Sequence, residues 1–85
     1  MDNAEYDGVV IKIDLDGKHG PYAVAKNDEI GKISFLLKPP VWREEDFPEL
    51  GTIVVLSRVT KKRAGWRAQQ GRFWRPSDEK MKKGA

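Results

Sequence analysis

The feature that most constrains the fold is a first run of residues in which every second position is apolar. Within residues 6–15, Val9, Ile11, Ile13 and Leu15 alternate with Val10, Lys12 and Asp14. This period of two is typical of a half-buried β-strand, because successive side chains of a strand point to opposite faces of the sheet. We therefore expect these residues to face the core. Gly8, near the start of the run, predicts a bulge or a bend.

Turn residues divide most of the remaining chain into further short runs with strand character. The expected second to fifth strands are residues 22–26, 30–37, 52–60 and 66–74. In the third strand, Ile33, Phe35 and Leu37 share one face. The fourth and fifth strands form a hairpin, and its turn at residues 61–65 ends on Gly65. The pattern predicts an all-β fold.

The connection between the third and fourth strands is irregular. The sequence Lys-Pro-Pro at residues 38–40 ends the third strand, because proline has no N–H to donate to a sheet. Residues 41–50 are short and bounded by prolines, so they hold at most one helical turn. We expect Trp42 and Phe47 to fold over one end of a barrel as a lid. The acidic residues of this connection would repel phosphate, which places it away from a phosphate-binding face; they are Glu44, Glu45, Asp46 and Glu49.

Five strands in a chain of 85 residues predict a small closed β-barrel, because closure removes the exposed edges of a sheet. The oligonucleotide-binding (OB) fold is a barrel of this kind and fits within this length. We expect one OB-fold domain at residues 1–76. A flexible basic tail is expected at residues 77–85, which have almost nothing to bury.

The expected fifth strand has no face that is apolar along its whole length. Trp66 and Trp74 are separated by an even interval and share a face with Arg72, whereas Phe73 lies on the other face. A bulge near Gly71 would reconcile the two faces. We expect Trp66 to be exposed and available to a ligand.

Charge is divided unevenly along the chain, although the net charge is only +3. Residues 1–57 hold 6 basic and 11 acidic residues, a net charge of −5, and residues 58–85 hold 10 basic and 2 acidic residues, a net charge of +8. Such asymmetry predicts an acidic partner for the C-terminal part. A membrane surface is also acidic, but the basic segment shows strand alternation rather than an amphipathic helix. We therefore expect a nucleic acid and no membrane as the partner.

Composition argues against several other functions. The chain has no cysteine, so neither a disulfide nor a cysteine zinc site can form. No apolar run approaches the roughly 20 residues of a membrane span, and residues 1–7 lack the apolar core of a signal peptide. We therefore expect a cytoplasmic protein. We also expect it to be a monomer. The one histidine, His19, lies with Asp14 and Asp16 around a glycine-rich turn. Turn polarity explains these residues better than a metal, a cofactor or catalysis does, and we expect no enzymatic activity.

Residues 51–76 carry the clearest indication of function. Trp66, Phe73 and Trp74 are interleaved there with arginine and lysine. Aromatic rings can stack on bases while cations meet phosphates, so this composition favours a single-stranded nucleic acid. The same residues also fit a small core with a solvated basic surface.

The order of motifs resembles a cold-shock domain over residues 6–76. The motifs are Gly-Val-Val at residues 8–10, Gly-Pro-Tyr-Ala-Val at 20–24, Ile-Gly-Lys-Ile-Ser-Phe at 30–35, Leu-Gly-Thr-Ile-Val at 50–54 and Lys-Arg-Ala-Gly-Trp-Arg-Ala at 62–68. The ribosomal RNA-binding repeat and bacterial translation initiation factor one share much of this pattern. The resemblance implies binding of single-stranded RNA or DNA on the face of the second and third strands. Tyr22 and Phe35 then stand at base-stacking positions.

The chain departs from the family at Val24, Lys32 and Ser34, where the family usually has two aromatic residues and a histidine. The stacking surface is therefore expected to be thinner and to extend onto the basic last hairpin, with Lys32 on a phosphate. Tyr22 and Phe35 also fit positions in a core. The expected nucleic-acid-binding residues are Tyr22, Lys32, Phe35, Lys61, Lys62, Arg63, Trp66, Arg67 and Arg72.

A second hypothesis is a protein-interaction module, or an accessory subunit of a larger nucleoprotein complex. In that case Trp42, Phe47 and Trp74 form an apolar contact with another chain, and the basic tail only assists. Binding to generic oligonucleotides at low salt would separate the two hypotheses.

Overall fold

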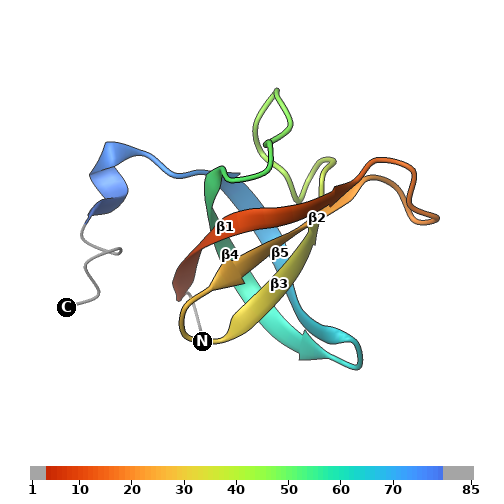
Figure 1. The fold of residues 1–85 in the computed structure, drawn as a ribbon, viewed down its shortest axis with the longest axis horizontal. Helices are drawn as coiled ribbons and strands as arrows, with labels where there is room; N and C mark the ends of the chain where they lie inside the picture. Colours follow the sequence, from red (N-terminus) through yellow and green to blue (C-terminus); the bar gives the residue numbers. More distant parts are fainter. Residues whose placement is uncertain (1–3, 80–85) are drawn as a thin grey trace.

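The β-strands close into a barrel in which each strand pairs with two neighbours. The computed structural model describes residues 4–79, and its strands are β1 (Glu5–Asp14), β2 (Tyr22–Asn27), β3 (Gly31–Leu36), β4 (Ile53–Lys62) and β5 (Gly65–Phe73). They follow one another around the barrel in the order β1-β2-β3-β5-β4, and β4 pairs with β1 to close it (Figure 1). The expected all-β barrel is confirmed, with each strand boundary within two residues of its expected position. This arrangement is compatible with an OB fold.

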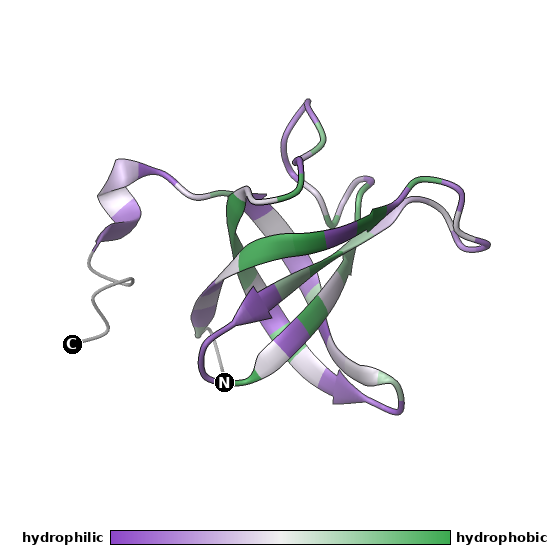
Figure 2. Ribbon diagram, in the orientation of Figure 1, coloured by the Kyte–Doolittle hydropathy of each residue, from purple (hydrophilic) through white to green (hydrophobic). Residues whose placement is uncertain are grey.

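Apolar side chains from all five strands fill the barrel. In β3, Ile33 and Phe35 are buried, and Leu37 continues the face that the sequence predicts. Ala25 and Ala23 of β2 pair with Ile33 and Phe35, so small side chains stand beside large ones. Figure 2 shows the apolar middle of β1 and, in contrast, the hydrophilic end of β4 at its hairpin.

The face that β1 turns inward differs from the prediction. Val10 is 1% exposed, whereas Ile11 is 44% exposed, and Val9 and Leu15 are exposed as well. The pairing of β1 with β2 shifts by one residue at Ile11, which is the extra residue of a bulge. Beyond the bulge, Ile13 packs against the core as predicted. The prediction of an inward face made of Val9, Ile11 and Leu15 was therefore wrong.

Gly8 does not form this bulge. It is buried and pairs in register with Val54 of β4. A Cβ atom on Gly8 would lie 3.0 Å from the Cβ atom of Ala25 and 3.2 Å from the carbonyl oxygen of Lys26. The glycine therefore permits a close approach of β1 to β2.

The inward faces of β4 and β5 each shift by one residue in mid-strand. The strands keep a single pairing register throughout, so the bulge predicted near Gly71 is absent. The inward positions nevertheless pass from Leu56 to Val59 in β4 and from Ala68 to Gly71 in β5. Arg58, with a left-handed φ of +54°, lies at the shift in β4. Both ends of β5 can therefore pack against the core, which a regular strand would not allow.

The connection from β3 to β4 contains no helix and closes one end of the barrel with Trp42. Trp42 is 3% exposed, and its ring lies 5.8 Å from that of Phe35 and 5.1 Å from that of Phe73, edge to face with the latter. The indole N–H donates a 2.8 Å hydrogen bond to the carbonyl oxygen of Asp46. Phe47 is 47% exposed, so the predicted lid consists of Trp42 without Phe47.

The chain leaves β5 through a short 3₁₀ helix, η1 (Pro76–Asp78). The carboxylate of Asp78 accepts two 2.9 Å hydrogen bonds from the guanidinium of Arg72 and one of 2.8 Å from the backbone N–H of Arg75. Asp78 of the expected tail is thus bonded to Arg72 of β5, and residues 80–85 lie outside the described residues. Within residues 4–79, no helix has the length and apolar character needed to cross a membrane.

Candidate nucleic-acid interface

One row of outward-facing side chains crosses all five strands. Paired residues of a sheet point to the same side, and the neighbours of these residues along β2 and β3 are buried. The row runs from Lys12 in β1 through Val24 in β2, Ser34 in β3 and Arg67 in β5 to Thr60 in β4. A cation therefore lies on each side of the uncharged centre of the face.

A second row brings two more cations to the same face. Lys26 of β2 pairs directly with Lys32 of β3, and both side chains are exposed. Like charges directly opposite each other destabilise a sheet. Within residues 4–79, no ion pair neutralises any of the four cations Lys12, Lys26, Lys32 and Arg67. The outer face of β1, β2, β3 and β5 is called the sheet face below.

Tyr22 begins a third row beside a cleft of about 340 Å³. The cleft lies between the β1–β2 loop and β3, and its lining includes Tyr22, His19, Ser34 and Arg67. The ammonium Nζ of Lys12 lies 5.7 Å from the centre of the half-buried Tyr22 ring. An aromatic ring, two cations and a hollow therefore lie together, which suits a base with its phosphate.

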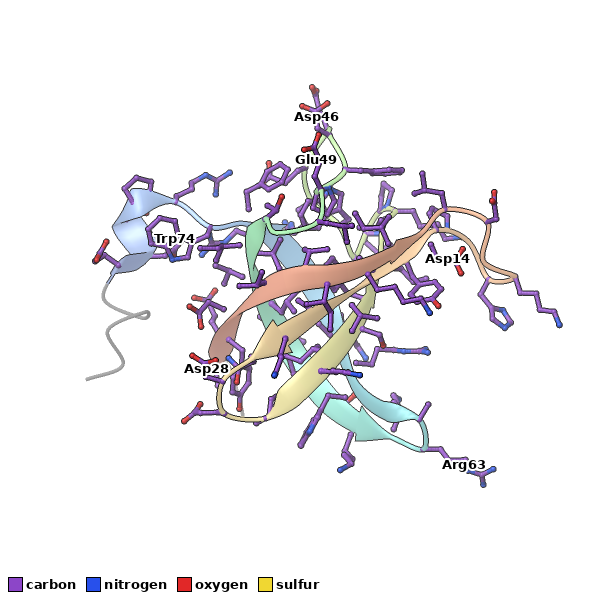
Figure 3. All side chains as sticks on the ribbon, viewed as in Figure 1. Asp14, Asp28, Asp46, Glu49, Arg63 and Trp74 are labelled. Atoms are coloured by element: carbon purple, nitrogen blue, oxygen red, sulfur yellow. The ribbon has the colours of Figure 1, made fainter. Side chains whose placement is uncertain are left out.

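The basic hairpin between β4 and β5 continues the sheet face. Lys61, Lys62 and Arg63 are exposed, and Thr60 immediately before them pairs with Arg67. Figure 3 places Arg63 at the hairpin tip, at the opposite end of the barrel from Asp46 and Glu49 of the acidic connection. The acidic connection therefore lies away from the basic hairpin, as its charge predicts.

Two of the expected aromatic contacts have other roles. Phe35 is 1% exposed and belongs to the core, so its ring has no face for a base, and its expected stacking role is wrong. Trp66 is half-buried and packs against the core, and the Nζ atom of Lys61 lies 5.0 Å from the centre of its ring. We expected an exposed Trp66 because an unbroken alternation places it on the same face as Arg72, whereas in the structure the inward face of β5 changes between Ala68 and Gly71.

Arg72 is engaged within the protein. Besides its hydrogen bonds to Asp78, its guanidinium lies 3.8 Å from the carboxylate of Glu5. The hydrogen bonds to Asp78 raise the pKa of Arg72 above its ordinary value, and those from Arg72 and from the backbone of Arg75 lower the pKa of Asp78 to about 2. We therefore remove Arg72 from the candidate interface.

Sequence reasoning missed two cations of the sheet face, Lys12 and Lys26. A signal for Lys12 was present, because the alternation of the first strand placed it on the side opposite to Ile13. Lys26 becomes recognisable only when the β2–β3 register sets it against Lys32.

The described residues contain no group of three or more histidine, aspartate or glutamate side chains that could hold a metal ion. Comparisons with protein-family models, curated proteins and solved structures find no match to this chain. The chemistry of the sheet face is therefore the basis for a functional proposal.

Proposed function

We propose that the protein binds single-stranded RNA or DNA on the sheet face and catalyses no reaction. The observation that carries this proposal is the direct pairing of Lys26 with Lys32 where, within residues 4–79, no ion pair neutralises either lysine. Such a pair costs stability in the free protein, and a chain of phosphates would remove the repulsion. Tyr22 beside the cleft supplies a ring for one base.

The barrel is further proposed to be of the cold-shock type. The strand order is compatible with an OB fold, in which the face of the second and third strands binds ligand. Tyr22 and Lys32 lie on that face, and Lys12 and Arg67 extend it to both sides. With Phe35 in the core, the proposed contact relies on charge more than on stacking.

Salt dependence tests the electrostatic part of the proposal. If the four cations of the sheet face each neutralise one phosphate, log affinity falls with log salt at a slope of about −3 for a single strand. Fluorescence anisotropy with labelled RNA and DNA of about ten nucleotides should then show a loss of about 50-fold between about 50 and about 200 mM salt. An affinity that is independent of salt would contradict the proposal.

Matched variants locate the contact. Lys32→Gln should reduce the salt slope by about 0.7, while folding stability stays equal or rises because the repulsion from Lys26 disappears. Arg75→Gln removes the same charge beyond the end of β5 and should leave the slope unchanged. Tyr22→Ala should weaken binding by about 1–3 kcal/mol, the value of one base stack. If Lys32→Gln and Tyr22→Ala both fold and bind like the parent, the sheet face is not the site.

A further inference from the structure

A second cleft, of about 680 Å³, lies between the β3–β4 connection and strands β4 and β5. Pro39 and Pro40 form an apolar wall, and Trp42 contributes to the lining. Arg43 comes from the connection and Arg58 from β4. The remaining lining is Glu44, Glu45, Gln69 and Gln70. This hollow is called the arginine cleft below.

The backbone at Arg58 gives the first indication that the arginine cleft has a role. Its φ of +54° lies in the left-handed region, which is less favourable for a residue with a Cβ atom than for glycine. The shift in β4 requires this conformation but does not require a long cationic side chain. Glycine or asparagine would meet the backbone requirement at a lower cost. The guanidinium at Arg58 therefore needs a separate explanation.

The charged groups of the cleft differ in what they bind. Within residues 4–79, the exposed side chains of Arg43 and Arg58 form neither an ion pair nor a hydrogen bond. Glu44 is already occupied, because its carboxylate accepts hydrogen bonds from the backbone N–H of Phe73 at 3.1 Å and from Arg75 at 3.0 Å. Two guanidiniums in one cleft are thus available to an acidic group.

We propose that the arginine cleft docks a segment of a partner protein in which an acidic residue stands next to apolar residues. The carboxylate would lie between Arg43 and Arg58, since guanidinium groups bind carboxylates through paired hydrogen bonds. An apolar side chain would pack against Pro39 and Pro40, and the amide of Gln69 can bond to a peptide backbone.

Charge favours a peptide over a nucleic acid here. Beside the two arginines the lining has two glutamates, of which Glu44 is paired with Arg75, and further acids follow at Asp46 and Glu49. A strand with one charge per nucleotide would meet these acids, whereas a single carboxylate meets the two arginines. The sheet face has four cations with no neutralising ion pair, so the two surfaces select different partners. This inference goes beyond the proposed nucleic-acid binding and does not rest on it.

Nuclear magnetic resonance of the full chain tests the proposal with a capped peptide, acetyl-Pro-Leu-Asp-Leu-amide, and its Asn counterpart. The Asp peptide should shift the side-chain N–H signals of Arg43, Arg58 and Gln69 saturably, with a dissociation constant of about 1 mM or tighter. The Asn peptide should bind about tenfold more weakly, because a charge-assisted hydrogen bond is lost.

Arg58→Gly provides the sharpest variant, because glycine suits the left-handed backbone. It should keep or raise the melting temperature, weaken binding of the Asp peptide about tenfold and change oligonucleotide affinity much less than peptide affinity. Arg63→Gly removes the same charge at the hairpin tip and should leave peptide binding unchanged. Arg43→Gln should also weaken binding of the Asp peptide. It serves as the test variant if Arg58→Gly fails to fold.

Three results would overturn the proposal. The first is equal binding of the Asp and Asn peptides, and the second is the absence of saturable shifts at Arg43 and Arg58. The third is that a DNA of about ten nucleotides at high salt displaces the peptide from the cleft and reverses the shifts of these signals. This result would assign the cleft to nucleic acid.

Discussion

Replacing either of two neighbouring residues in β1 by aspartate should have very different effects. Val10 is 1% exposed, so Val10→Asp loses about 1.5–3 kcal/mol of apolar burial. Placing a carboxyl group in the core costs several kcal/mol more, even if the group becomes protonated. The sum is comparable with the whole stability of a small domain, which is about 5–15 kcal/mol. We expect Val10→Asp to be unfolded or close to it.

Ile11→Asp should be tolerated, because Ile11 is the extra residue of the bulge and is 44% exposed. Because the Ile11 side chain is only about half buried, its replacement loses roughly 1 kcal/mol of apolar burial. The low strand propensity of aspartate adds up to about 1 kcal/mol of destabilisation. The two variants should therefore differ by about 3 kcal/mol or more. Urea unfolding followed by tryptophan fluorescence measures this difference, since Trp42 is buried in the folded state.

The control is Ile13→Asp, which places the same charge beyond the bulge on a residue that packs against the core, and which should destabilise strongly. If Ile11→Asp unfolds the protein while Val10→Asp resembles the parent, β1 alternates without a bulge. Equal stability losses for Val10→Asp and Ile11→Asp would also refute the assignment of inward and outward positions.

Two further predictions concern the core and the C-terminal ion pair. The pKa of Asp78 is lowered to about 2 in the folded protein by its hydrogen bonds from Arg72, so its stabilisation should be complete above about pH 4 and disappear as pH falls toward 2. Asp78→Asn should flatten thermal stability over this range, and an unchanged pH profile would contradict the pairing. Gly71→Ala should cost about 1–3 kcal/mol in urea unfolding, because a Cβ atom there would lie 3.2 Å from the Trp42 ring and 3.1 Å from Leu56. A neutral effect would mean that the lid is loosely packed.

Most of the barrel can be predicted from the residue types along the chain. The predictions fail where the backbone is irregular, because residue types do not reveal these irregularities. The face of β3 is predicted because Ile33 and Phe35 alternate with polar residues. In β1, residues 9–11 are all apolar, so the residue types do not show that a bulge moves the inward face from Val10 to Ile13. The shift of the inward face at Arg58 likewise cannot be predicted from the sequence, because arginine is not a residue type that indicates a left-handed backbone.

The candidate site was less predictable than the fold, because it depends on which strands lie side by side. Lys32 and Arg67 were recognised as cations that could meet phosphate, but only the pairing shows Lys26 opposite Lys32. From the sequence alone, Arg72 is an equally good candidate for a phosphate contact. In the structure its guanidinium is bonded to Asp78 of η1. Charge identifies which residues could bind phosphate, and strand register determines which of them lie together.

The two proposed sites lie close enough along β5 to influence each other. Arg67 belongs to the sheet face and Gln69 to the arginine cleft, and two residues of a strand span about 7 Å. This is within the screening length of about 8 Å at physiological salt, so an acidic peptide in the cleft should repel phosphates near Arg67. By thermodynamic linkage, a bound nucleic acid must lower the affinity of the cleft for the peptide by the same factor. Measuring oligonucleotide affinity with and without saturating Asp peptide should show a several-fold loss at about 50 mM salt that shrinks as salt rises. Antagonism that persists at high salt would instead mean that both ligands compete for one surface, and the sheet face and the arginine cleft would then be a single site.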